Sequence, residues 1–559
     1  MAKYNQKVEP VVHKTTTHQG GTGYTQKPEH ELISILATGM DNTFYEKEGE
    51  REKRFRDLIS NIASKNKEFV AKALVYARTV FGQRSVTHFG AVELIPFLQG
   101  DNLGKRFFSK RDRKVNKGGI IYRLDDMTEI LAAYLAKNGA DASIPNSIKR
   151  GFKEAIENAD AYEMAKYQMK GKSVSLVDIV NLVHPAETQK QGTIEVSVDE
   201  YAKAVKGTKL EKEGVKLIES FKAEGPEYKI RVPALRALVL GILKQFNTVE
   251  DKNTEAGKVV AEKVKTGVIS KEEAAKELNE AKTENYVELI KTKKIGYLAL
   301  LRNIRNILKT DNTEVLDMAC ELLVNKDFIR KSLVWPHQID LALEVMLVEF
   351  SGSKMTKVVK ALNDAYELSI PNLKELFSYG RTAVVFDSSG SMNTPVTMAD
   401  KKRGRAGALD KAALIAATLA KGLDADAYEF ASRCKKLSFN PLDSVNSIKQ
   451  KFIRDADGGG TYWSSIFPVL SQNGAYDRVF IMSDEQGADE VETSYRAYCQ
   501  QFGTPHVYVI NLCGYGPTMI KQNTKVHRIF GYTADIYETA KKTEIDPEAV
   551  IAEINAIEI

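Results

Sequence analysis

A run of β-branched and aromatic residues, Thr382–Phe386, ends abruptly in a carboxylate and three hydroxyl groups. The run predicts a buried strand, and the loop after it reads Asp387-Ser-Ser-Gly-Ser391. In an open α/β sheet, ligands lie in the crevice beyond the carboxyl ends of the strands. Asp387, Ser389 and Ser391 therefore have the spacing and the oxygen atoms to converge on a hard cation. The loop is also compatible with a plain turn, because Asp and Ser commonly form turns and helix caps.

Two later loops favour the metal site over the plain turn. Gly458-Gly-Gly-Thr461 offers a flexible approach and one hydroxyl, and the apolar run 478–482 is followed shortly by Asp484. A carboxylate–dihydroxyl loop, then Gly-Gly-Thr, then an Asp at a strand end resembles the metal-ion-dependent adhesion site of a von Willebrand factor A domain. The resemblance implies that five residues bind a divalent cation, most simply Mg²⁺: Asp387, Ser389, Ser391, Thr461 and Asp484. It also implies a coordination position left open for an acidic group of a protein partner.

The stretch from residue 378 to 559 alternates strands with helices. Strands are expected at 382–386, 426–430, 478–482, 505–512 and 526–530, and helices at 410–423 and from about 546. Alternation of this kind is typical of a doubly wound, Rossmann-like parallel sheet. We therefore predict an α/β domain of the von Willebrand factor A type at 378–559.

The pattern upstream of residue 378 is different. Residues 1–27 are polar, rich in Thr, Gly and Lys, and without periodicity, which predicts a flexible N-terminal arm. From residue 28 to 377, apolar residues recur at i, i+3, i+4 spacing, for example at 71–78 and 127–135, and no alternating strand is convincing. Helical hairpins in succession stack into a solenoid, so this part is predicted to be all-α with degenerate, HEAT-like repeats.

Length and composition narrow the possibilities further. A chain of 559 residues is too long for one core, so several domains are expected. No apolar run is long enough to cross a bilayer, and the first residues lack the apolar core of a secretory signal. The four cysteines are widely spaced, which favours reduced thiols in the cytoplasm. Residues 1–377 carry 60 basic and 52 acidic side chains, an excess that fits either a polyanionic partner or an ordinary solvated surface.

The densest basic stretch is 105–117, which holds seven cations, one acid and the pair Phe107-Phe108. Such a stretch suits phosphate contacts with base stacking, or it is a solvated loop whose two phenylalanines lie in the core. The first interpretation makes RNA ligands of Lys105, Arg106, Lys110 and Arg111. A second cluster, 166–172, precedes Ser173, but Lys166 stands where a phosphate-binding loop requires glycine, so no nucleotide site is expected there.

Four segments resemble the TROVE module of the Ro autoantigen family: Ser85–His88, Asp125–Glu129, Val174–Pro185 and Ala299–Asn303. A TROVE module followed by a von Willebrand factor A domain is the order found in that family, and the lack of long extensions resembles its bacterial or phage members. The resemblance implies a helical-repeat ring at 28–377, lined by basic residues and closed by the A domain. It also implies a noncoding Y-like RNA on the outer surface and single-stranded ends of misfolded RNA in the ring.

Carried onto this sequence, the resemblance places Lys170, Lys172 and His184 in the segment that contacts Y RNA. It places Arg84, His88 and Arg123 in segments near the ring surface. The sequence departs from the family at Arg123-Leu-Asp125, where relatives usually have a central proline, and the Lys- and Glu-rich segment 188–292 matches no known segment.

Two functions remain open. The leading one is a noncatalytic RNA-binding scaffold of a ribonucleoprotein for RNA quality control or decay, in which an exoribonuclease partner performs any degradation. The alternative is a metal-dependent protein-adhesion module on a helical-repeat platform, without RNA. An enzyme is not expected, because no general base, catalytic triad or nucleotide loop accompanies the metal loop. We expect a cytoplasmic monomer with no membrane partner.

Overall fold

The structure is a computed structural model that describes most of the chain. The described residues are 13–40, 44–47, 49–168, 173–221, 223–243, 257, 259–266, 268–292, 295–310, 312–332, 334, 336–349, 352–371, 373–393, 407–533 and 535–559. The chain divides into two compact units. The first contains Met1–Leu58 and Val249–Glu553, and the second contains Ile59–Thr248 and Ile554–Ile559.

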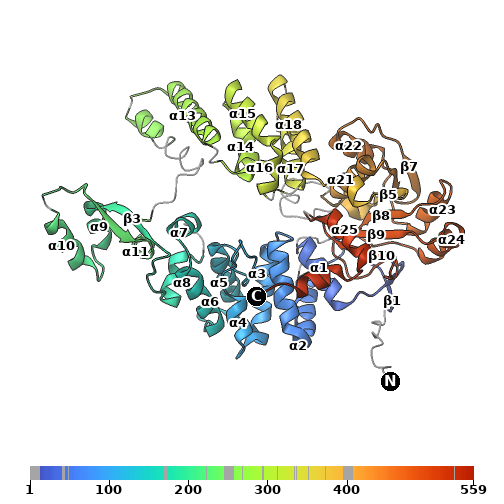
Figure 1. Ribbon diagram of the computed structural model, residues 1–559, viewed down its shortest axis with the longest axis horizontal. Coiled ribbons are helices and arrows are strands. Elements are labelled where there is room, and N and C mark those ends of the chain that lie inside the picture. Colours follow the sequence, from blue (N-terminus) through green and yellow to red (C-terminus); the bar gives the residue numbers. More distant parts are fainter. Residues whose placement is uncertain are drawn as a thin grey trace. The chain divides into compact units, whose positions relative to one another are not determined.

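The first unit is built around a six-stranded sheet (Figure 1). Its strands are β5 (Thr382–Asp387), β6 (Asp426–Phe430), β7 (Cys434–Leu437), β8 (Arg478–Ser483), β9 (His506–Asn511) and β10 (Val526–Phe530). They lie in the order β10-β9-β8-β5-β6-β7, and every neighbouring pair is parallel except β6–β7. This is the doubly wound sheet expected from the sequence, and the strand order reverses between β5 and β8. The antiparallel edge strand β7 was not expected.

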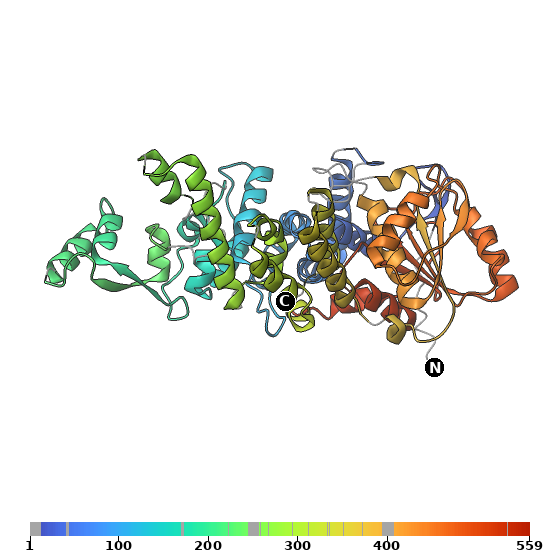
Figure 2. The ribbon, with the colours of Figure 1, turned by 90° about the horizontal axis from the view of Figure 1, so that it is seen from above.

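Helices cover both faces of the sheet (Figure 2). One face packs against α21 (Gly407–Leu423), α22 (Val445–Asp455) and α25 (Ile536–Ile545), and the other against α23 (Ile466–Ser471) and α24 (Glu492–Phe502). Successive residues of β5 serve the two faces in turn: Phe386 stacks on Phe452 of α22, whereas Val385 joins the core with Phe467 of α23. Because both faces are covered, the central strands are continuous apolar runs.

A set of helices precedes the sheet within the same unit. They are α1 (Pro28–Thr38), α13 (Lys271–Lys291), α14 (Tyr297–Lys309), α15 (Thr313–Leu323), α16 (Lys326–Ser332), α17 (Pro336–Glu349), α18 (Ser353–Ser369) and α19 (Leu373–Leu376). Neighbouring helices pack along their apolar stripes, as in the pairs α14–α15 and α17–α18. The boundary predicted at residue 377 does not divide the units, because α18 and α19 share one core with α21 and α22.

The second unit is mostly helical. It contains the greater part of α2 (Glu50–Thr79), then α3 (Ser85–Leu94), η1 (Ile95–Leu98), α4 (Asn102–Phe107), α5 (Leu124–Asn138), α6 (Asn146–Glu157), α7 (Ala161–Tyr167) and α8 (Leu176–Val183). These helices confirm the predicted helical character. None of the helices within the described ranges combines the length and the apolar character that a membrane crossing requires.

The expectation that no strand would occur before residue 378 is wrong. Strands β3 (Thr193–Ser197) and β4 (Lys229–Pro233) pair antiparallel, with α9 (Val198–Val205) and α10 (Glu211–Ser220) between them and α11 (Ala234–Val239) after them. Ile194 faces Val232 and Val196 faces Ile230 across the ribbon. Each strand therefore has the alternating pattern of a half-exposed sheet, but it is only five residues long within a Lys- and Glu-rich segment.

Part of the predicted flexible arm is also ordered. Strand β1 (Lys14–Thr16) pairs antiparallel with β2 (Thr22–Tyr24), and a tight turn with Gly20 at φ 90° joins them. The backbone of Tyr24 exchanges hydrogen bonds of 2.8 and 2.9 Å with Thr518. Residues 1–12 lie outside the described residues. A hairpin of three residues per strand is not stable alone, so this one depends on docking against the sheet domain.

Candidate functional site

The five residues predicted to bind a metal lie together at the carboxyl ends of β5 and β8, where the strand order reverses. All five are at most 3% exposed: Asp387, Ser389, Ser391, Thr461 and Asp484. The Ser389 and Ser391 hydroxyl oxygens are 3.2 Å apart, and the Ser389 amide donates to Asp387 Oδ1 at 2.9 Å. The short 3₁₀ helix η2 (Gly390–Asn393) turns the loop so that both hydroxyls face inward. The sequence pattern thus identified residues that the fold brings together.

Backbone geometry places the glycine loop against the first loop. Gly458 and Gly459 have φ angles of 68° and 113°, which side-chain-bearing residues rarely adopt. This conformation lets the Gly459 carbonyl accept a hydrogen bond of 3.0 Å from the Gly390 amide. On the other side, the Ser483 hydroxyl donates to Asp387 Oδ2 at 2.6 Å and ties the end of β8 to that of β5.

A buried ion pair fixes the loop that carries Asp484. Glu485 has a left-handed backbone with φ 59°, which is uncommon for a residue with a side chain. Its carboxylate pairs with the Arg528 guanidinium and accepts a hydrogen bond of 3.0 Å from the Asn511 amide. Because both charged groups are buried and paired, the turn after Asp484 is held in one conformation.

The electrostatics of the site favour a cation. Burial raises the pKa of Asp387, and the neighbouring Asp484 raises it further. Burial also raises the pKa of Asp484, whose Oδ2 is buried without a hydrogen-bond partner. Within the described ranges no Lys, Arg or His forms an ion pair with either carboxylate, so a cation would relieve an uncompensated buried charge.

The donor set fits Mg²⁺ in particular. It combines two carboxylates with three hydroxyls, which are hard oxygen ligands, and the ion keeps some of its waters. Within the described residues, no group of three or more His, Cys, Asp or Glu side chains is arranged to hold a metal. Hydroxyl ligands are therefore what distinguishes this site, and Mg²⁺ when bound would neutralise the two carboxylates.

The N-terminal hairpin lies directly over this site, which the sequence did not indicate. The Gln19 amide Nε2 donates to the Thr461 hydroxyl at 2.9 Å and also to the Tyr45 hydroxyl. On either side of Gln19, the His18 amide donates to Gln486 Oε1 at 3.0 Å, and the Thr17 hydroxyl donates to the Gly487 carbonyl at 2.6 Å. Thr461, Gln486 and Gly487 are more than 400 positions away along the chain, so no local pattern could have revealed these contacts.

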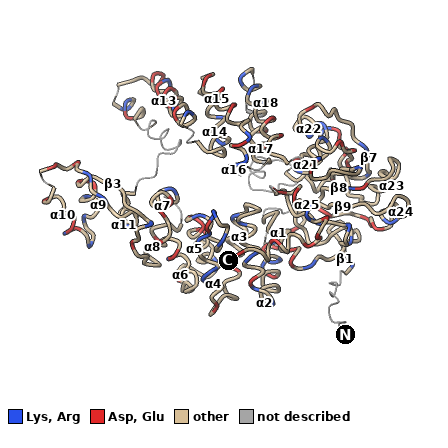
Figure 3. The backbone as a smooth tube through the Cα atoms, viewed as in Figure 1, with Lys and Arg blue, Asp and Glu red and all other residues tan. Residues whose placement is uncertain are grey.

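The residues predicted to contact RNA near the ring surface are engaged with acids. Arg84 lies 2.7 Å from Asp125 and 3.1 Å from Asp126, and His88 lies 3.2 Å from Asp126. Arg123 lies 2.8 Å from Asp125. Figure 3 shows both acidic and basic residues along the chain around α5. Because His88 is only 3% exposed, its predicted contact with RNA is not supported in this conformation.

The basic stretch 105–117 is partly structural. Arg111 is 2% exposed, and its guanidinium donates to the carbonyls of Gly118 and Asn116. Its prediction as an RNA ligand is therefore not supported, because a polyanion cannot reach it. Phe107 and Phe108 are fully buried and pack against each other at 5.0 Å, so they belong to the core and do not stack on bases.

The remaining predicted RNA ligands differ in their solvent exposure and in their ion pairs. Lys110 pairs with Glu163, and Lys105 is half exposed, 3.6 Å from Glu154. Arg106 is exposed, and His184 is exposed at the left-handed C-cap of α8, with φ 44°. Lys170 and Lys172 lie outside the described residues.

A chain of cations and aromatic rings leads from α5 to α7. The Arg123 guanidinium lies 4.9 Å from the centre of the Tyr167 ring. Lys166 Nζ lies 5.5 Å from the Tyr167 ring and 5.4 Å from the Tyr162 ring. Tyr162 is 49% exposed, and Lys166 is also exposed. This cluster of Arg123, Tyr162, Lys166 and Tyr167, here called the cation–aromatic ladder, presents phosphate-binding charge beside a ring on which a base can stack.

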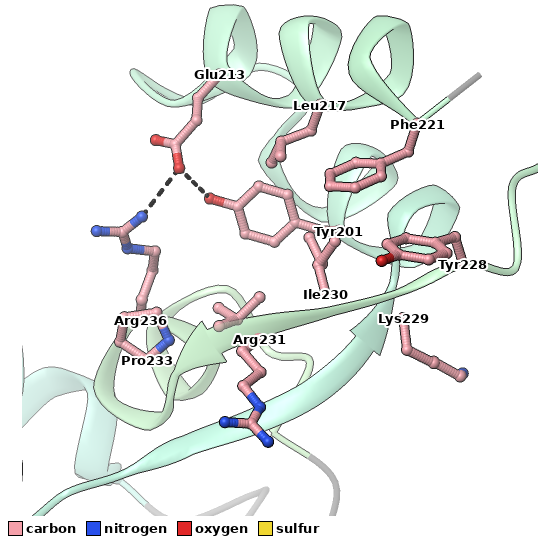
Figure 4. Close-up of a pocket in the computed structure, with 11 residues that line it drawn as sticks. Tyr201, Glu213, Leu217, Phe221, Tyr228, Lys229, Ile230, Arg231, Pro233 and Arg236 are labelled. Atoms are coloured by element: carbon pink, nitrogen blue, oxygen red, sulfur yellow. Dashed lines mark hydrogen bonds and ion pairs between the residues drawn. The ribbon is translucent and has the colours of Figure 1, made fainter. Parts of the chain in front are cut away.

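The second unit also contains a pocket of about 410 Å³ between the β3–β4 ribbon, α9 and α10 (Figure 4). Phe221 and Tyr228 stack at 4.6 Å along one wall. At the other end, Glu213 accepts a hydrogen bond of 3.1 Å from Tyr201 and pairs with Arg236 at 3.0 Å. Glu213 and Arg236 thus neutralise each other, and Lys229 and Arg231 also line the pocket.

Comparisons with known proteins gave one kind of match. No protein-family profile and no curated protein matches the sequence. Among solved structures, the crystal structure of the Ro (RSR) protein of Deinococcus radiodurans is similar, with a TM-score of 0.47 and 15% identity over 93% of this chain and 99% of that chain. The function of this chain rests on its own residues.

Proposed function

We propose that this chain is a Ro-like RNA-binding scaffold of a ribonucleoprotein. In this proposal a Y-like RNA binds the outer surface of a helical-repeat ring, and single-stranded ends of misfolded RNA enter the ring. The chain itself cuts no bond, and a partner exoribonuclease carries out degradation. The scaffold acts in the cytoplasm as a monomer.

The cation–aromatic ladder is the observation that carries the proposal. Single-stranded RNA is held without sequence preference when cations follow its phosphates and aromatic rings stack on its bases. Lys166 and Tyr162 supply one exposed group of each kind on a single turn of α7. Lys170 and Lys172 follow closely in the sequence, and Lys105 and Arg106 add exposed charge from α4.

The alternative, a metal-dependent adhesion module, has support from the five assembled metal-site residues. Such a module needs a coordination position that an acidic group of a partner can reach. Here Gln19 contacts Thr461 at the rim of the site, and the five residues are buried. The geometry therefore favours the RNA scaffold, with the metal site in a structural role.

Filter binding with a labelled RNA that has a stem and a single-stranded 3′ tail tests the proposal. The double variant Tyr162→Ala/Lys166→Ala should lose about 5- to 150-fold in affinity, because one stacked base contributes about 1–3 kcal/mol. Lys203→Ala is the matched control, since that side chain is 76% exposed in the same unit and pairs with Asp199 on its own helix. Equal affinities for all three proteins would refute the assignment.

A further inference from the structure

The turn of the N-terminal hairpin is inserted at the rim of the metal site. Gln19 contacts Thr461 directly, and it also contacts Tyr45, whose ring stacks on His18 with centres 5.2 Å apart. Tyr45 in turn packs edge-on against Tyr515 at 5.3 Å. The amide of Gln19 is therefore held in place from both sides, by a site residue and by an aromatic cluster.

Two further residues of the hairpin, Gly21 and Thr22, also contact the sheet domain. Gly21 sits so close to the loop after β8 that an added Cβ would lie 2.4 Å from the Gly487 carbonyl oxygen and 2.5 Å from the Asp489 carbonyl oxygen. The Thr22 amide donates to that same Asp489 carbonyl at 3.2 Å. Only glycine allows this approach, so the sequence of the turn is matched to its docking surface.

One carboxylate oxygen of the site has no hydrogen-bond partner. Asp484 Oδ2 is buried without a hydrogen bond, and the nearby Tyr45 hydroxyl interacts with the Ser391 hydroxyl, a predicted ligand. An unpartnered buried carboxylate oxygen favours a cation there. A hard cation accepts an amide oxygen as readily as a hydroxyl or a carbonyl. A half-turn of the Gln19 amide would exchange its nitrogen and oxygen with little movement of the chain.

We infer that Gln19 is the resident ligand of this metal site. It occupies the position that adhesion sites of this type leave for a partner's carboxylate, either directly or through a water. Cation binding therefore fastens the N-terminal hairpin to the sheet domain of the same chain. The inference rests on the proposed metal site, and it adds that the site closes on its own chain.

Two measurements on the full-length protein test this inference. Mn²⁺, a probe visible by electron paramagnetic resonance, reports affinity, and hydrogen–deuterium exchange reports the protection of residues 13–24 with and without Mg²⁺. In the wild type, Mg²⁺ should slow exchange in the hairpin. Gln19→Ala should weaken Mn²⁺ binding about 10-fold or more and abolish that protection, as for other residues that support metal ligands.

Gln19→Glu separates a ligand from a plain hydrogen-bonding residue. A carboxylate binds a hard cation better than an amide, so this variant should bind Mn²⁺ more tightly than the wild type. Without metal it should loosen the hairpin, because it loses both amide donors and adds a third carboxylate. Lys14→Ala, exposed on β1, is the matched control and should behave as the wild type.

The outcomes separate the two proposals. If the wild type binds no Mn²⁺, the metal site is refuted and the inference with it. If the wild type binds Mn²⁺ but Gln19→Ala and Gln19→Glu bind it equally well, the metal site stands and the inference is overturned. Unchanged exchange in the hairpin on adding Mg²⁺ overturns the inference as well.

Discussion

Lys449 Nζ lies 3.0 Å from the Asp340 carboxylate, and the Lys449 side chain is fully buried. The ammonium is also 2.8 Å from Glu344, so a cation of α22 is held between two acids of α17. This contact joins the last helical hairpins to the sheet domain. Breaking a buried pair from one side leaves charge without a partner, which costs about 3–5 kcal/mol.

The change Lys449→Ala should therefore lower the free energy of unfolding of the sheet-containing unit by about 3 kcal/mol or more. Urea denaturation followed by circular dichroism measures it. Lys451→Ala, on the same helix, removes a partly exposed i,i+4 pair with Asp455 and should cost less than about 1 kcal/mol. Similar losses in the two variants would show that the buried contact stabilises the unit no more than an exposed ion pair does.

A second prediction concerns metal-dependent stability. Mg²⁺ at about 100 times its dissociation constant should stabilise the wild type by about 2.7 kcal/mol, seen as a rise in melting temperature. Asp484→Asn should abolish that rise. In EDTA the same variant should melt above the wild type, because it removes repulsion from the buried Asp387. The exposed Asp424→Asn is the control, and a Mg²⁺ effect that persists in Asp484→Asn contradicts the site.

A third prediction is a pH dependence centred on Glu544. Burial raises the pKa of this carboxyl, but hydrogen bonds from Lys541, Tyr508 and Arg478 outweigh burial and lower it from 4.5 to about 2. A lowered folded-state pKa stabilises the fold fully above pH 4.5, and that stability is lost as the pH falls toward 2. The contribution is about 2–3 kcal/mol at neutral pH.

Glu544→Gln should therefore be less stable than the wild type at pH 7, and the gap should narrow steadily below pH 4.5. Urea midpoints between pH 7 and pH 3 measure the gap. Glu314→Gln, a change at an exposed carboxylate, should show no such trend. A gap that stays constant over this range would mean that the Glu544 carboxyl does not contribute through its charge.

A fourth prediction separates structural from RNA-binding cations. Arg84→Ala leaves the buried Asp125 and Asp126 with fewer partners, so it should lower stability by about 1–3 kcal/mol. It should leave the salt dependence of RNA affinity unchanged. Lys166→Ala should leave stability unchanged. It should reduce the slope of log affinity against log salt by about 0.7, for one lost phosphate contact. A reduced salt slope in Arg84→Ala would show that Arg84 contacts RNA, which contradicts this prediction.

The positions of the proposed metal ligands at the sheet edge could be predicted because their signal is local. Asp387, Ser389 and Ser391 follow a strand of uninterrupted apolar residues, and Asp484 follows another. A strand of that kind can only be buried in a covered sheet, so the polar residues at its end must lie at the sheet edge. Topology then brings the two loops together without any further information.

The cations and the hairpin were not predictable in the same way. A basic residue in a sequence does not show its partner. Arg84 and Arg111 therefore looked alike, although Arg84 lies in an ion-pair network and Arg111 donates to backbone carbonyls. Gln19 lies in a polar segment without periodicity, and its partner Thr461 is 442 positions away. Such contacts depend on tertiary docking, which leaves no periodic pattern in the sequence.

Binding of a tailed RNA and of its blunt duplex counterpart, each across a salt series, tests the central claim most directly. The account predicts tight binding at low salt that requires the single-stranded tail and weakens steeply as salt rises, since phosphate contacts release counterions. Equal affinity for both RNAs would contradict recognition of single-stranded ends. No binding of either RNA at low salt would contradict the ribonucleoprotein scaffold itself.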